Sequence, residues 1–193
     1  LDSVEAGGTY NVAIGDSAGT AISTGDENTF TGYKSGAATT LAIGNTAVGF
    51  GSLELNVLGS RSVAIGRAAL QLQNPASAVD MYNVAVGYGA GESVSTGVRN
   101  TLIGGLAGDA LTDADYNVAV GYAALSQDTL GSKSTALGYN ALNTQNFTTA
   151  TDTYNVAVGM SAGEAVTTGV QNTLIGGLAG DGMTTGDNNT ALG

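Results

Sequence analysis

The chain has 193 residues with a formal net charge of −11, from 16 acidic and 5 basic residues, and it contains neither Cys nor His. So few basic residues disfavour nucleic acid and anionic membrane surfaces as partners, because both are bound by clustered Lys or Arg. Without His and Cys, the chain lacks Ser-His-Asp and Cys-His nucleophile systems and nearly all zinc sites, so we expect neither an enzyme nor a cofactor.

A five-residue word, first read as Asn11-Val12-Ala13-Ile14-Gly15, recurs to the end of the chain. Successive copies start 17, 17, 17 and 21 residues apart, and these 72-residue blocks open at 11, 83 and 155. The stretch 1–10 is similar to the end of a 21-residue unit, so we interpret residues 1–193 as one repeat segment of a longer chain. A fixed period of this kind is typical of stacked repeat architectures. The residues that define the repeat include Asn11, Gly15, Asn83, Gly87, Asn100, Gly104, Asn117, Gly121, Asn155, Gly159, Asn172 and Gly176.

Each word has the composition of a short strand. Its second and fourth residues are Val, Thr, Ile or Leu, and its third is Ala in eight of eleven copies. Residues at alternate positions share one face of a strand, so the second and fourth residues make one face apolar. Ala at the third position makes the opposite face apolar as well. We expect the Val/Ile face to line the coil interior and the Ala face to be covered by another chain.

The rest of each unit indicates turns. The fifth position is always Gly, which suggests a bend that a Cβ would block or a close backbone approach. The ninth position is Gly or Leu, and there we expect a second short strand. The 21-residue units add four residues at one place, so a longer loop should project at every fourth rung.

These features predict an all-β fold, a parallel β-solenoid with one coil per 17–21 residues and rungs about 4.8 Å apart. A helical fold is excluded by the Gly in every unit and by the β-branched runs. The Asn that opens most words should form a ladder along the stack, as in other stacked Asn arrays.

The words 11–15 and 62–66 resemble the head repeats of trimeric autotransporter adhesins. The longer phrases 45–53 and 135–142 are even more similar to the repeats of phage tail fibres. The resemblance implies a left-handed β-roll with three chains packed side by side. Adhesin heads use coils shorter than 17 residues, and this difference favours the fibre comparison.

Two sets of side chains are candidates for binding. Glu92 with Asp109, and Glu164 with Asp181, occupy the tenth position on neighbouring rungs, where they would form a cation site or a glycosidase pair, or be solvated turn carboxylates. Aromatic residues often follow the Gly of the word and either bind sugars or form a packing ladder. The candidate sugar-binding residues are Tyr88, Tyr122 and Tyr139.

The sequence thus predicts a structural shaft of a homotrimeric fibre, most similar to a phage tail fibre, on a virion surface or otherwise extracellular. A bacterial surface adhesin and an extracellular filament are the alternatives. The expected partner is a second and third copy of the chain, with a host cell-surface glycan or protein as a further possible ligand. Neither nucleic-acid binding nor membrane insertion is expected.

Overall fold

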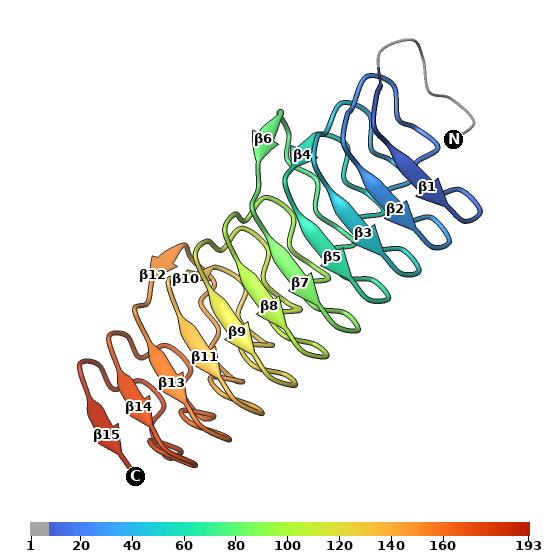
Figure 1. Ribbon diagram of the computed structural model, residues 1–193. Helices are drawn as coiled ribbons and strands as arrows, with labels where there is room; N and C mark the ends of the chain where they lie inside the picture. Colours follow the sequence, from blue (N-terminus) through green and yellow to red (C-terminus); the bar gives the residue numbers. More distant parts are fainter. Residues whose placement is uncertain (1–7) are drawn as a thin grey trace.

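The computed structural model describes residues 8–193, and in that range it is a rod of stacked coils without a helix (Figure 1). The predicted all-β parallel solenoid, with about 17 residues per coil, is therefore confirmed. Most of the stretch 1–10, interpreted as the end of a preceding unit, lies outside the described residues. Residues 8–193 contain no helix long and apolar enough to cross a membrane.

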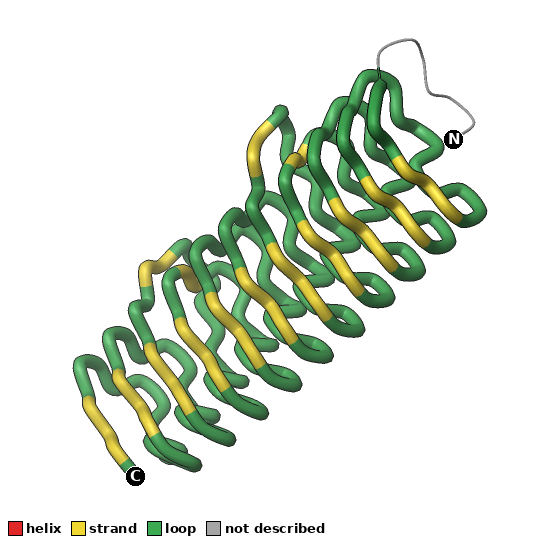
Figure 2. Tube along the Cα trace, in the orientation of Figure 1, coloured by secondary structure: helices red, strands yellow, loops and turns green. Residues whose placement is uncertain are grey.

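Eleven short strands, one for each word, form a single parallel sheet along the rod (Figure 2). In stacking order they are β1 (Val12–Ile14), β2 (Thr29–Thr31), β3 (Thr46–Val48), β5 (Val63–Ile65), β7 (Val84–Val86), β8 (Thr101–Ile103), β9 (Val118–Val120), β11 (Thr135–Leu137), β13 (Val156–Val158), β14 (Thr173–Ile175) and β15 (Thr190–Leu192). Each residue pairs with its equivalent in the next word, so Ala85 lies beside Leu102 and Ala119 beside Ala136.

The longer units project from the rod as predicted. Each longer unit also pairs with the coil before it through a second, short parallel ladder: β4 (Gly59–Ser60) pairs with β6 (Val79–Asp80), and β10 (Gly131–Ser132) pairs with β12 (Thr151–Asp152). β6 and β12 extend beyond the outline of the other coils (Figure 1). The four extra residues are therefore accommodated outside the stack, and the strand register continues through them.

The prediction of which strand face lines the coil was wrong. The third residue of the word points inward, so Ala47, Ala64 and Leu102 are fully buried within a single chain. The second and fourth residues point outward, and Ile65 and Ile103 remain 40% and 39% exposed. A coil of 17 residues encloses little space, and the third position suits it because Ala stands there in most units and a large side chain such as Phe30 or Leu102 faces Gly at the ninth position.

The ninth residue completes this thin core, and the second strand expected there is absent. The position is a turn in which both Gly and Leu have positive φ, for example Gly108 at 56° and Leu125 at 55°. Gly stands where the third residue of the same or a neighbouring word is large: a Cβ on Gly36 would lie 2.6 Å from the Phe30 ring. Leu stands where the third residue is Ala, as in the unit containing Ala119. The two columns thus compensate each other in volume, because close-packed interiors tolerate neither voids nor overlap.

The Gly that closes each word is required for both of the predicted reasons. Gly121 has φ 136°, and a Cβ there would lie 2.4 Å from the carbonyl oxygen of Gly138 on the next rung. The same approach recurs along the stack from Gly15 to Gly159, at 2.2–2.6 Å. Backbone therefore lies directly on backbone at this corner.

The expected Asn ladder is confirmed, and it joins side chain to backbone. Asn100 Oδ1 accepts a hydrogen bond from the backbone N–H of Asn117 at 2.9 Å, and Asn100 Nδ2 donates to the carbonyl of Ala114 at 2.7 Å. One side chain thus links two rungs and also closes its own coil. Asn83, Asn117, Asn155 and Asn172 repeat this pattern.

The ladder changes at the longer units, where Ser replaces Asn. Ser62 carries too short a side chain to reach across the coil, and the buried Gln73 takes over by accepting hydrogen bonds from Ser62 Oγ and Asn83 Nδ2 at 3.2 and 3.0 Å. Gln145 has the same role in the second block, where its Oε1 accepts from Ser134 Oγ and Asn155 Nδ2 at 3.4 and 2.8 Å. Each projecting loop is therefore rooted in a hydrogen-bonded polar core.

We expect Gly121→Ala to lower the free energy of unfolding by more than about 3 kcal/mol, because the new methyl group would overlap the Gly138 carbonyl at a left-handed position. Gly177→Ala is the matched control, since its Cβ would meet only Met160 O at 4.0 Å. Urea unfolding followed by circular dichroism measures both. Equal stability of the two variants would contradict the stacking contact.

We expect Asn100→Ala to cost about 2–4 kcal/mol, because it leaves the buried N–H of Asn117 and the carbonyl of Ala114 without partners. Asn189→Ala, on the exposed last rung, should cost less than about 1 kcal/mol. The same unfolding assay compares them. A loss at residue 189 as large as that at residue 100 would show that the ladder does not carry this stability.

Candidate functional site

Aromatic and cationic side chains form two exposed columns on the rod. The turn column follows the Gly of the word and comprises Tyr33, Phe50, Arg67, Tyr88, Tyr122 and Tyr139. The entry column precedes the word and comprises Arg61, Tyr82, Arg99, Tyr116, Lys133 and Tyr154 on six successive rungs. The columns arise because one residue per coil is placed above its equivalent in the next.

The turn column brings together only part of the predicted sugar-binding set. Tyr122 and Tyr139 stack with ring centroids 5.8 Å apart, whereas Tyr88 is separated from them by the rung of Gly105. Tyr88 instead contacts Arg67, whose Nη1 donates to its hydroxyl at 3.0 Å. The three tyrosines remain 53–56% exposed, so the stacking leaves much of each ring open to solvent.

The entry column alternates cation and tyrosine. The Arg99 guanidinium lies 6.0 Å from the ring centroid of Tyr82 and 5.3 Å from that of Tyr116, within the range of cation–π attraction. The alternation also separates like charges by two rungs. Tyr82, Tyr116 and Tyr154, which the sequence analysis did not select as ligand-binding candidates, therefore belong to a continuous cationic and aromatic edge.

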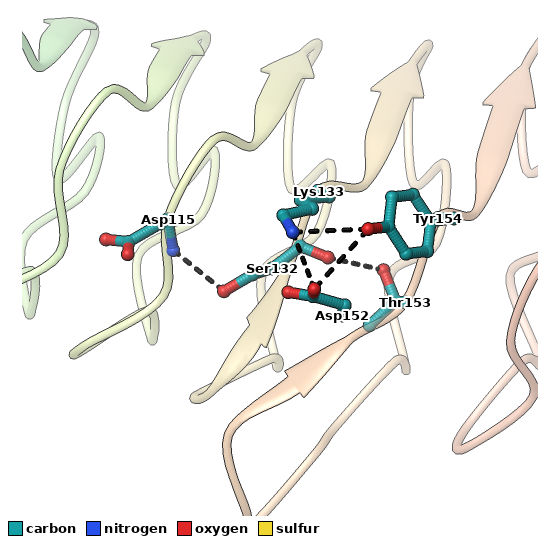
Figure 3. Close-up of polar contacts among 6 residues, drawn as sticks. All are labelled: Asp115, Ser132, Lys133, Asp152, Thr153 and Tyr154. Carbon is teal, nitrogen blue, oxygen red and sulfur yellow. Dashed lines mark hydrogen bonds and ion pairs between the residues drawn. The ribbon is translucent and has the colours of Figure 1, made fainter.

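A cation–carboxylate–tyrosine cluster occurs in both blocks of this column. Lys133 Nζ donates to Asp152 Oδ2 at 2.5 Å and to the Tyr154 hydroxyl at 3.2 Å, and the hydrogen bond to Asp152 is the main cause of the raised pKa of Lys133 (Figure 3). Ser132 anchors the cluster by accepting from the backbone N–H of Asp115 at 2.9 Å. Arg61, Asp80 and Tyr82 are equivalent in the preceding block and make the same contacts. The 72-residue repeat of these residue types is the sequence signal that would have identified the cluster.

A hollow of about 590 Å³ opens beside the first cluster, under the projecting loop. Its lining combines polar, apolar and charged side chains: Ser60, Ala78, Val79, Asp80, Tyr82 and Arg99. This volume is within the range of small-molecule sites, roughly 300–1,000 Å³. None of these residues was a candidate from the sequence.

The predicted carboxylate pairs differ from each other. Burial, and to a smaller extent the charge of Glu92, raises the pKa of Asp109, and Asp109 Oδ1 is buried without a hydrogen-bond partner among the described residues. Glu164 instead accepts a hydrogen bond from Asn140 at 3.2 Å, and Asp181 is exposed. Residues 8–193 contain no group of three or more acidic side chains placed to hold a metal ion.

The outward face of the sheet carries a row of partly exposed apolar side chains. The fourth residue of the word is Ile, Val or Leu in ten of eleven strands, and these side chains form a stripe along the rod. Val and Thr share the second position beside them.

Comparison of the chain with models of protein families, with curated proteins and with solved structures finds no match.

We expect Asp109→Asn to raise the melting temperature at pH 7, by the equivalent of less than about 1 kcal/mol, because it removes a half-buried charge. The raised pKa means that the folded state favours the protonated form of Asp109. The stability that this carboxyl contributes is therefore fully present below its usual pKa of 3.8, and it is lost as the pH rises through its pKa in the folded chain. The difference between variant and wild type should therefore vanish in acid. Asp181→Asn is the control and should leave the melting temperature unchanged at both pH values. A destabilised Asp109→Asn variant at pH 7 would contradict this account.

Proposed function

We propose that the chain is a structural shaft segment of a homotrimeric fibre, comparable to a phage tail fibre and placed on a virion surface or otherwise outside the cell. The observation that carries this proposal is the apolar stripe on the outward face of the sheet. Ile65, Ile103 and Ile175 are each about 40% exposed in the single chain, in line with one another along the rod. Contiguous apolar surfaces of this kind mark interaction sites in soluble proteins.

A second copy of the same rod is the partner that fits such a stripe best. The stripe repeats at every rung, so only a surface with the same repeat can cover it over its whole length. Closed symmetry would bury all copies of the stripe at one axis, and the resemblance to trimeric fibres favours three chains. In that arrangement each added coil lengthens the fibre by about 4.8 Å.

The rod itself has the properties of a spacer. Its stability is distributed over hydrogen bonds and contacts between adjacent rungs, so length can be added without changing the cross-section. Its net charge of −11 helps to keep it soluble. These features support a mechanical role and require no catalytic residue.

A surface adhesin is the second candidate, and the exposed rings of Tyr88, Tyr122 and Tyr139 favour it. The same rod would then present the turn column to a host glycan or protein. A glycan array probed with the purified chain separates the two roles. Binding that is lost in a Tyr122→Ala, Tyr139→Ala double variant would support the adhesin, and no binding would support the passive shaft.

We expect light scattering of the wild-type chain to give three times the monomer mass of 18.9 kDa. Ile103→Asp should shift the mass to that of one chain, because a charge would be buried without a partner at the interface. Leu72→Asp is the control: Leu72 is 42% exposed but lies outside the word strands, so trimers should persist. A monomeric wild-type chain, or an Ile103→Asp variant that remains trimeric, would overturn the proposed interface.

A further inference from the structure

The hollow beside Tyr82 combines features that the structural role does not require. It is lined by Ser60 on the coil before the first long unit, by Asp80 on the loop of that unit and by Arg99 on the coil after it. Tyr82 is 46% exposed and contributes aromatic C–H surface, with Arg61 and Arg99 on its ring at 5.8 and 6.0 Å from the centroid. Ala78 and Val79 extend the apolar part of the lining.

Arg99 is the least satisfied charged group of this hollow. Arg61 is paired with Asp80, whereas Arg99 has no ion pair with any residue of the described range. Its Nη1 donates to the Tyr116 hydroxyl at 2.9 Å, and the rings of Tyr82 and Tyr116 flank the guanidinium. A guanidinium has five N–H donors in a planar fork, so Arg99 retains donors suited to a carboxylate in a bidentate arrangement.

The remaining lining determines what kind of anion fits. Asp80 disfavours a doubly charged phosphate by repulsion, but its carboxylate accepts hydrogen bonds from hydroxyl groups. Ser60 Oγ accepts from the backbone N–H of Ile43 at 3.0 Å, which leaves its hydroxyl hydrogen free to donate to a ligand. Arg61 and Arg99 lie 5.8 and 6.0 Å from the Tyr82 ring centroid, so the exposed part of the ring that remains offers an apolar contact to the C–H groups of a cyclic ligand. The best fit is one carboxylate, several hydroxyls and one apolar face.

We propose that this hollow binds an acidic sugar residue of the uronic-acid type. The carboxylate pairs with Arg99, the sugar ring packs against the exposed part of Tyr82, and the hydroxyls donate to Asp80 and accept from Ser60. The net negative charge of the rod acts against such a ligand only weakly, because exposed charges are screened beyond about 8 Å at physiological ionic strength.

The second block provides an internal comparison. It retains the cluster as Lys133, Asp152 and Tyr154, but Gln171 stands at the position equivalent to Arg99. Glutamine cannot pair with a carboxylate as an ion. The first block is therefore the one that should bind the acidic sugar, and Arg99 is the residue that makes the difference.

Isothermal titration of the full chain with D-glucuronate, at pH 7 and fixed salt, tests the site. We expect a dissociation constant on the order of millimolar, as for a small ligand with few contacts, and at least about tenfold weaker binding by Arg99→Gln. Arg67→Gln removes the same charge from the turn column and should leave the affinity within about twofold of wild type. Tyr82→Ala should weaken glucuronate binding, and a melting curve of each variant verifies folding.

D-glucose and acetate separate the parts of the proposal. Glucose shares the ring but lacks the carboxylate, and acetate lacks the ring, so both should bind at least about tenfold more weakly than glucuronate. Glucose binding as tightly would overturn the role of Arg99, and acetate binding as tightly would reduce the site to a carboxylate counter-ion. Absence of glucuronate binding to the wild-type chain, or equal loss in Arg67→Gln, would overturn the proposal. In an Arg99→Gln background, Gln171→Arg should restore measurable binding at the second block, and its failure to do so would count against the cluster as the scaffold.

Discussion

The fold depends on backbone stacking at the Gly corner of each word. Parallel pairing holds equivalent residues at one rung spacing, and at this corner the spacing leaves no room for a Cβ between Gly121 and the carbonyl of Gly138. A single larger side chain would push two rungs apart and disturb every other column at that level. The Gly of the word is therefore a geometric requirement of the stack, and its recurrence in all eleven units follows from it.

The same spacing determines how the core is built. Because each coil is thin, its apolar interior is built mainly from the third, eighth, ninth and twelfth positions of the unit, and Leu111 and Val94 are buried at the twelfth. A large residue in one column requires a small one in another, as Phe30 with Gly36 shows. Leu125 and its equivalents even occupy a left-handed conformation, which costs a non-Gly residue about 1–2 kcal/mol, because the neighbouring Ala leaves volume to fill. Packing thus overrides backbone preference at these corners.

Much of this architecture could be predicted from the sequence, because the spacing between equivalent residues gives the length of each coil directly. The strands, the projecting loops, the Gly contact and the Asn ladder all follow from residues that recur at fixed spacing. The inward face could not be assigned from periodicity, since a strand that is apolar on both sides carries no alternation between inside and outside. The complementary side-chain volumes of Phe30 and Gly36 identify the inward face. They can be recognised only when the two positions are known to face each other inside the coil. Likewise, Gln73 has its role because its side chain lies beside Ser62, which stands where other units have Asn. This contact crosses the coil, so the spacing of residues in the sequence does not reveal it.

The exterior of a repeat protein repeats as well, and this constrains where a specific site can arise. A column such as the sheet stripe presents the same chemistry at every rung, so it favours a partner with the same period, as another copy of the rod has. A small ligand instead requires a place where the repeat is interrupted. The projecting loops with β6 and β12 interrupt the regular shape of the rod. The charge also differs between the two blocks, because Arg99 in the first is replaced by Gln171 at the equivalent position of the second. The two coincide at the hollow beside Tyr82, and this is why we propose the long unit of the first block as the place where the rod has individual binding chemistry.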